Sequence, residues 1–88
     1  MPWVELNSTG LRAAAYQDQL ALLELEFRSG ATYQYFGVSE QTYQELLLAE
    51  SKGAYFHRHI RDRFPYAKIH PAEPKSKELR ATSLPLNG

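Results

Sequence analysis

Residues 23–36 read Leu-Glu-Leu-Glu-Phe-Arg-Ser-Gly-Ala-Thr-Tyr-Gln-Tyr-Phe, and this stretch decides the fold. Its first half, residues 23–28, alternates apolar and charged side chains with a period of two, which is typical of a strand with one buried face. Ser29 and Gly30 then supply a tight turn, in which glycine can adopt a positive φ. Residues 32–36 are rich in β-branched and aromatic side chains, so they predict a second, antiparallel strand.

Upstream of this hairpin, residues 11–16 predict one more strand. The polar residues 17–19 are few enough to form the turn that joins it to the alternating strand. The three strands together form an antiparallel meander. The sequence leaves open whether Trp3 and Val4 add to this sheet or cover its core.

Two helices are predicted downstream, where the hydrophobic period changes from two to about 3.6. Ser39 is a good N-cap for the first helix, whose apolar residues recur at three- and four-residue spacing and would pack on the sheet. We expect Gly53 to end this helix in a left-handed conformation. Residues 54–63 then form a second, short helix, which stops before Pro65. Residues 66–69 fit either a short closing strand or an extended arm.

The predicted architecture is an α+β domain, in which two helices pack on one face of a three-stranded antiparallel meander. The chain has 88 residues, which is enough for one domain. We place this domain at residues 1–69. Residues 70–88 mix prolines, lysines and serines with few apolar anchors, so we expect them to form a flexible C-terminal tail.

Composition excludes several classes of protein. The chain has no cysteine, so neither a disulfide framework nor a cysteine-based zinc site can support the core. Its first residues do not have the pattern of a signal peptide. No apolar run approaches the roughly 20 residues that span a bilayer. We therefore expect a cytoplasmic protein that has no membrane partner.

The net charge is zero, but the two halves of the chain differ in sign. Residues 1–50 hold seven acidic and two basic residues, whereas residues 51–88 hold eight basic and three acidic residues. Zero net charge argues against non-specific binding of nucleic acid by the whole molecule. A basic face on the second half still permits such binding.

The order of these motifs resembles the KTSC domain, a module at the C-terminus of some lysyl-tRNA synthetases that is also found as small stand-alone bacterial proteins. The resemblance covers about residues 7–69 and rests on Tyr-Gln-Tyr at 33–35, Ser-Lys-Gly at 51–53, Tyr-Phe at 55–56 and Ile-Arg at 60–61. The family has no established activity. Its synthetase context implies a role in RNA binding, which is an argument from association.

Tyr33 and Tyr35 are the first candidate site residues, and they share one face of their strand because side chains alternate along it. On a solvent-facing sheet surface, the two rings would form a platform on which unstacked bases can stack. Under the helices, the same rings would instead fill the core. The sequence leaves both possibilities open.

The second helix and its surroundings supply the other candidates. A basic strip there could contact phosphates, with Tyr55 or His57 available for stacking; its members are Lys52, Arg58, Arg61 and Lys68. The alternative is a solvated helix face, whose basic residues pair loosely with the acidic half of the domain.

We find no residue pattern that indicates catalysis, a cofactor or a metal. The serines have turn or capping roles, and no glycine-rich phosphate loop is present. Glu24 and Glu26 lie on a predicted solvated strand face. His57 and His59 would point about 200° apart on a helix, so they cannot ligate one ion together. We therefore expect a protein that is not an enzyme.

The expected function is that of a small non-catalytic binding module for RNA or another single-stranded nucleic acid. Lys52, Arg58, Arg61 and Lys68 would contact phosphates, and Tyr33, Tyr35 or Tyr55 would stack on bases. The alternative is a protein-interaction module that uses a free sheet edge or the C-terminal tail. The oligomeric state is left open.

Overall fold

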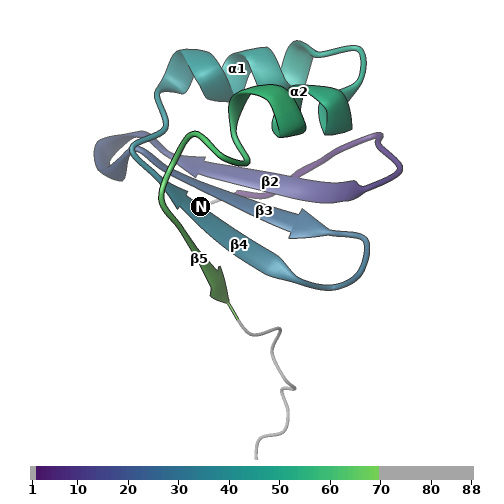
Figure 1. Ribbon diagram of the computed structural model, residues 1–88, viewed down its shortest axis with the longest axis horizontal. Helices are drawn as coiled ribbons and strands as arrows, with labels where there is room; N and C mark the ends of the chain where they lie inside the picture. The colour runs from purple at the N-terminus through teal and green to yellow at the C-terminus, as the bar shows by residue number, and fades with distance from the viewer. Residues whose placement is uncertain (1, 70–88) are drawn as a thin grey trace, which may run out of the picture.

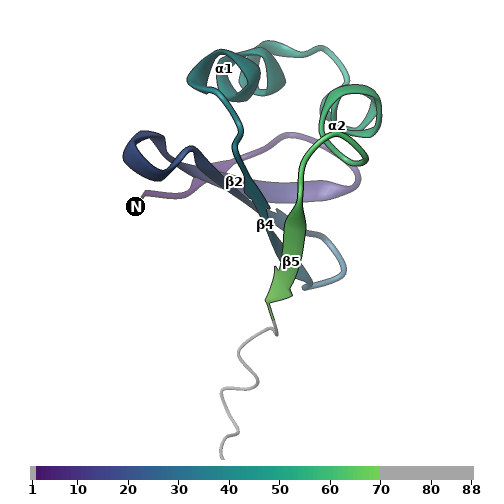
Figure 2. The same cartoon turned by 60° about the vertical axis from the view of Figure 1, so that its left-hand side comes forward.

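Five antiparallel strands form one sheet in the computed structural model, which describes residues 2–69 of the chain (Figure 1). Their order in the sheet is their order in the chain: Val4–Glu5 (β1), Leu11–Gln17 (β2), Leu22–Phe27 (β3), Thr32–Phe36 (β4) and Tyr66–Ile69 (β5). Two helices, Glu40–Leu48 (α1) and Lys52–His59 (α2), cover one face of this sheet (Figure 2). The predicted tail, residues 70–88, lies outside the described residues.

The α+β class and the placement of both helices on one face are confirmed, but the predicted number of three strands is wrong. The predicted meander corresponds to β2, β3 and β4. Its outer edges are extended by β1, which pairs with β2, and by β5, which pairs with β4. The sequence did not predict these two strands because they are short. The strand β1 has two residues, which cannot show an alternating pattern, and β5 has four, which repeat the pattern only once. The predicted turn at residues 17–19 is a short 3₁₀ helix, Asp18–Leu20.

The alternation in β3 decides which face of the sheet is buried. Leu25 lies opposite Tyr33 in the β3–β4 register, and both belong to the face beneath the helices. Glu24 lies opposite Gln34 on the other face, where the Gln34 amide donates a hydrogen bond to the Glu24 carboxylate. The assignment of Tyr33 to the same face as Tyr35 is therefore correct, and that face carries the helices.

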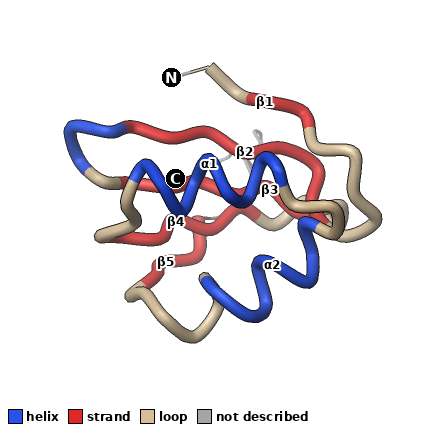
Figure 3. The backbone as a smooth tube through the Cα atoms, turned by 90° about the horizontal axis from the view of Figure 1, so that it is seen from above, coloured by secondary structure: helices blue, strands red, loops and turns tan. Residues whose placement is uncertain are grey.

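The core lies between the sheet and the two helices. It consists of Leu6, Leu11, Ala14, Leu23, Leu25, Tyr35, Val38, Tyr43, Leu46, Phe56 and Ile60. Seen from the helix side, α2 lies on the β5 side of α1 (Figure 3). The helix α1 packs Tyr43 against Tyr16 of β2, with ring centroids 4.9 Å apart. The helix α2 inserts Phe56 edge-on between Phe27 and Tyr35, at 5.4 and 5.7 Å. Burial of these side chains is the main stabilising term.

Serine caps begin both helices. The side chains of Ser39 and Ser51 each accept a hydrogen bond from the backbone N–H three residues further on, as N-caps do. The prediction for Gly53 is wrong, because this residue lies inside α2 and has no positive φ. The helix α1 has already ended at Leu48, and Ser51 begins the next helix. The predicted positive φ of Gly30 is confirmed, at 97°.

The second helix ends earlier than predicted. It occupies Lys52–His59, and Ile60 leaves the helical conformation with φ −125° and ψ −48°. Ile60 itself is fully buried, so the core fixes the chain at the point where the helix ends. Arg61 consequently lies on a turn after the helix. It does not share a helix face with Arg58, as it would if the predicted helix continued to residue 63.

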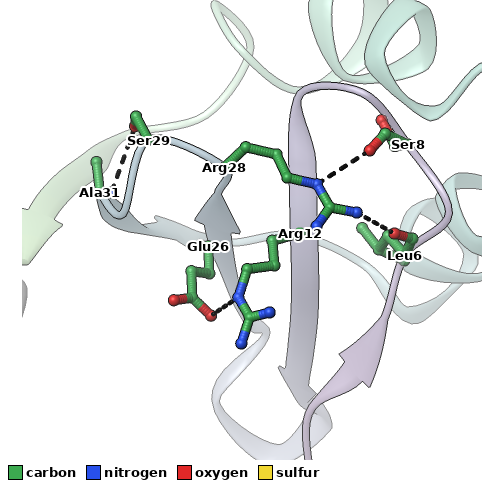
Figure 4. Close-up of polar contacts among 7 residues, drawn as sticks. All are labelled: Leu6, Ser8, Arg12, Glu26, Arg28, Ser29 and Ala31. Atoms are coloured by element: carbon green, nitrogen blue, oxygen red, sulfur yellow. Dashed lines mark hydrogen bonds and ion pairs between the residues drawn. The ribbon is translucent and has the colours of Figure 1, made fainter.

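Arg28 fixes the N-terminal segment beside the sheet (Figure 4). Its Nε donates to the Ser8 carbonyl at 3.2 Å, and its Nη2 donates to the Leu6 carbonyl at 3.3 Å. On the sheet nearby, Arg12 Nε lies 3.6 Å from Glu26 Oε1. Both partners of that ion pair are substantially exposed, so it contributes about 0–1 kcal/mol.

Candidate functional site

A groove of about 540 Å³ lies between the end of α2 and the strands β4 and β5. Five aromatic side chains form a large part of its lining, which we call its aromatic floor: Phe27, Tyr33, Tyr35, Phe56 and Tyr66. Its polar lining consists of Ser29, His57, Arg61, Asp62 and Lys68, with Ala31 beside them. The groove thus combines residues from the strands β3, β4 and β5, from the β3–β4 turn, from α2 and from the segment that follows α2.

Three tyrosines are grouped in the aromatic part of the groove. Tyr66 lies opposite Tyr35 in the β4–β5 register, so the two side chains share the helix-covered face. The ring centroid of Tyr66 lies 5.7 Å from that of Tyr33 and 5.8 Å from that of Tyr35. Tyr35 is 3% exposed, Tyr33 is half-buried and Tyr66 is 59% exposed. Tyr66 is therefore the ring that an incoming planar group can reach.

The charged part of the groove carries two permanent cations and one carboxylate, from Arg61, Lys68 and Asp62. Lys68 lies opposite Tyr33 in the β4–β5 register. Arg61 Nη1 lies 3.4 Å from His57 Nδ1. The excess positive charge beside aromatic rings favours a ligand that is both anionic and planar.

Of the seven site residues expected from the sequence, the groove unites Tyr33, Tyr35, Arg61 and Lys68. Two of these are tyrosines beneath the helices, and burial leaves Tyr35 with no ring face for stacking. Of the two possibilities that the sequence left open for this pair, the structure shows the second: the rings of Tyr33 and Tyr35 lie under the helices and do not form a platform on a solvent-facing sheet surface. The physical reason is that both helices cover the face on which these two rings lie.

The other three predicted residues, Lys52, Tyr55 and Arg58, do not line the groove. Lys52 Nζ donates to the Ala49 carbonyl at 3.0 Å, where a cation is favourable at the C-terminal end of α1. Arg58 is exposed on α2. The basic strip expected on the helix is thus divided between the groove and the outer surface of α2.

Tyr66 is the most exposed aromatic residue of the groove, and the predicted site did not include it. A signal for it exists in the alternation of residues 66–69, since Tyr66 and Lys68 share one face if this segment is a strand. Pairing that strand antiparallel to β4 would have brought Tyr66 to Tyr35 and Lys68 to Tyr33, as the register now shows.

The environment of Tyr35 keeps its hydroxyl protonated. Burial is the largest cause that raises the pKa of Tyr35 to about 12, and the neighbouring Tyr33 and Tyr66 add to it. The guanidinium of Arg61 acts in the opposite direction. At neutral pH, the Tyr35 hydroxyl is consequently a hydrogen-bond donor that lies within the electrostatic influence of Arg61.

Tyr55 joins the two helices. Its hydroxyl donates to Glu45 Oε1 at 2.7 Å, from α2 to α1. Burial, followed by this hydrogen bond, raises the pKa of Tyr55 to about 12. The same hydrogen bond is the largest cause that lowers the pKa of Glu45. The hydroxyl of Tyr55 thus has a structural role between the two helices, while the stacking role expected for its ring stays a prediction.

Replacing Tyr55 with phenylalanine is expected to raise the pKa of Glu45 towards its ordinary value, because the largest cause of the lowering is removed. A carboxyl pKa that is lower in the folded state stabilises the fold above the unfolded pKa, and this contribution is lost as the pH falls through the folded pKa. The measurement is an NMR pH titration of the Glu45 carboxyl carbon.

Tyr33→Phe is the matched control for that titration, because it removes a tyrosine hydroxyl that is not bonded to Glu45. It should leave the Glu45 titration unchanged. An unchanged Glu45 pKa in Tyr55→Phe itself would contradict the hydrogen bond between the helices.

Two further observations concern residues 2–69. Within that range, no group of three or more His, Cys, Asp or Glu side chains is arranged to hold a metal ion. Among the helices of the same described part, none has the length and apolar character needed to cross a membrane.

Comparison with known proteins matches residues 7–64 to the KTSC domain family. A lysine–tRNA ligase of Nostoc sp. is 37% identical over 68 residues, which cover 77% of this chain and 12% of the ligase. The chain therefore spans about an eighth of the ligase relatives that it matches. An uncharacterized protein of Stutzerimonas stutzeri is 41% identical over 58 residues, which cover 66% of this chain and 82% of that protein.

The fold is also that of a solved relative. The crystal structure of a KTSC domain protein from Yersinia pestis matches with a TM-score of 0.76 and 33% sequence identity, over 78% of this chain and 97% of the other. The matched family region includes Arg61 and ends at residue 64, before Tyr66 and Lys68. The resemblance found in the sequence is confirmed, and the chain belongs to the KTSC domain family.

Proposed function

We propose that this domain binds single-stranded nucleic acid, with RNA as the favoured ligand, in the groove between α2, β4 and β5. The observation that carries the proposal is the exposed ring of Tyr66 on an aromatic floor, with Arg61 and Lys68 in the same groove. Proteins that bind single strands combine aromatic rings for the bases with cations for the phosphates. The role is one of binding, not of catalysis.

The stacking part of the proposal rests on Tyr66, which Tyr33 and Tyr35 support. Tyr66 is held in place by Tyr33 and Tyr35, yet 59% of its surface remains exposed. A ring that is already positioned loses little conformational freedom when a base stacks on it. Each such stacked base contributes about 1–3 kcal/mol to binding.

The electrostatic part rests on Arg61 and Lys68. Both lie in the groove with Tyr66, whereas Asp62 is the one carboxylate in the lining. The volume of about 540 Å³ is in the usual range of sites for small organic groups, which is roughly 300–1,000 Å³. A nucleotide can thus place its base on the aromatic part and its phosphate beside the cations.

The relatives support RNA as the ligand. A segment similar to this chain lies within enzymes named as lysine–tRNA ligases. The link is an association between a domain and the protein that contains it, and it is weaker than an observation on the groove itself. If the protein binds RNA, as proposed, we expect it to act in the cytoplasm.

Replacing Tyr66 with alanine is expected to lower the affinity for single-stranded RNA by about tenfold or more, because a stacking ring is lost. Fluorescence anisotropy of a labelled mixed-sequence RNA, at about 50 and 200 mM salt, measures this change. The wild-type affinity should itself fall as salt increases.

Two variants control that titration. Tyr66→Phe keeps the ring and should bind nearly as well as the wild type. Phe36→Ala removes an aromatic residue of similar exposure, 41%, from the opposite face of the sheet, and should have no effect. Equal losses in Tyr66→Ala and Phe36→Ala would contradict the placement of the ligand in the groove.

A protein-interaction role is the second candidate function, and the position of β5 favours it. Within residues 2–69, this strand pairs with β4 on one side and forms the outer edge of the sheet. An extended peptide could add to such an edge by backbone hydrogen bonds. Binding of that kind would depend little on salt, unlike binding of RNA.

A further inference from the structure

The Tyr35 hydroxyl is a buried polar group for which the described residues provide no hydrogen-bond partner. The hydroxyl of Tyr16 donates to the Val38 carbonyl, and that of Tyr55 donates to Glu45. Tyr35 is 3% exposed and makes no such bond within residues 2–69. A buried donor without an acceptor costs roughly 1–3 kcal/mol, so an acceptor supplied by a ligand would relieve this cost.

The position of this hydroxyl is on the groove side of the ring. The groups that influence its ionisation are Tyr33, Tyr66, Arg61 and Asp62, and all four line the groove with Tyr35. The ring itself is held from the helix side by Phe56, at a centroid distance of 5.7 Å. The donor therefore belongs to a nearly buried residue of the groove lining whose ring is held in place by the core.

The neighbours of the hydroxyl define the chemistry of its acceptor. Arg61 and Lys68 contribute two permanent positive charges, and Asp62 contributes one negative charge. An acceptor that is itself anionic makes favourable contacts with both cations and with the neutral hydroxyl. A phosphate oxygen has this chemistry, because a phosphate group accepts several hydrogen bonds at once.

We propose that the Tyr35 hydroxyl, Arg61 and Lys68 form a phosphate subsite in the groove, which holds the phosphate of a nucleotide whose base stacks on Tyr66. This inference rests on the proposed function and names the ligand group that these three residues of the groove recognise. Tyr35 thereby has a role other than stacking: it supplies a donor, and its ring supports Tyr66.

The test compares adenosine 5′-monophosphate with adenosine, by NMR titration of the ¹⁵N-labelled full chain. We expect the monophosphate to bind about tenfold more tightly than the nucleoside, because the charged hydrogen bonds are present in it alone. Tyr35→Phe should lower the affinity for the monophosphate by about tenfold and leave the affinity for adenosine unchanged.

Tyr35→Phe removes no hydrogen bond within the described part of the chain, so it should remain folded. Tyr43→Phe is the matched control, because Tyr43 is also a buried tyrosine, at 8% exposed, but does not line the groove. Arg61→Gln is a second variant that leaves the core untouched, since Arg61 is exposed. It should also lower the affinity for the monophosphate.

The outcomes separate this inference from the proposed function. If single-stranded RNA binds, but the monophosphate and the nucleoside bind equally well, the phosphate subsite is refuted and the proposed function stands. Equal binding of the monophosphate by Tyr35→Phe and Tyr43→Phe would also refute it. If the monophosphate binds as expected and RNA does not, the subsite stands as a mononucleotide site and the proposed function fails.

Discussion

Replacing Arg61 and Lys68 together with alanine is expected to weaken binding of single-stranded RNA by at least about tenfold. Both side chains line the groove together with the aromatic residues that would receive the bases. Removing two phosphate contacts should also reduce the slope of log affinity against log salt by about 1.4 for a single strand. Anisotropy titrations at four salt concentrations measure the affinity and this slope together.

The control for this variant is Arg58→Ala combined with Arg63→Ala. It removes the same charge from the same region of the chain, but neither residue lines the groove. We expect a loss of less than about threefold from the weaker long-range attraction. Equal losses in the two double variants would mean that overall charge, and not the groove, determines the affinity.

Leu46→Ala is expected to lower the free energy of unfolding by about 2–5 kcal/mol. Leu46 is fully buried in α1, between the helix and the sheet, so its truncation leaves a cavity in a core of few side chains. For a domain of this size, such a loss is a large part of the total stability. Urea denaturation followed by circular dichroism measures it.

Leu48→Ala provides the matched control in the same helix. Leu48 is 83% exposed, so the same chemical change there should alter the stability by less than about 0.5 kcal/mol. Similar losses at both positions would contradict the orientation of α1. Since α1 does not line the groove, folded Leu46→Ala should still bind RNA.

The central part of the fold could be predicted because local patterns and tertiary packing agree there. The alternation of β3 and the β-branched and aromatic residues of β4 each point to a strand, and both strands extend over enough residues to show a pattern. Ser39 marks the start of α1 clearly, since its cap is observed. The edge strands could not be predicted in the same way, because pairing with a neighbour and not sequence periodicity determines them.

The boundary between the two helices shows why single-residue signals fail. The run of residues 51–53 contains both an N-cap serine and a glycine that suits the end of a helix. The short connection after α1 decides between these roles, and Ser51 acts as the cap while Gly53 continues the helix. The same early start and end of α2 carry Arg61 away from Arg58 and into the groove.

The groove could be predicted in part. The shared face of Tyr33 and Tyr35 follows from strand geometry. The sequence of this strand does not determine which of its two faces the helices cover. Tyr66 depends on the pairing of β5 with β4, a contact between residues about thirty positions apart in the sequence. Sites formed by such long-range pairing become visible only when the register of the sheet is known.

The most direct test of RNA binding in the groove is a titration of the ¹⁵N-labelled protein with a single-stranded RNA at low salt, followed by NMR chemical-shift mapping. Binding in the groove predicts chemical-shift changes concentrated on the backbone amides of groove residues, those of Ala31, Tyr33, Arg61 and Lys68, with small changes in α1 and β1. The absence of any change at low salt, where charge attraction is strongest, would contradict it. Changes confined to α1 and β1 would contradict it as well.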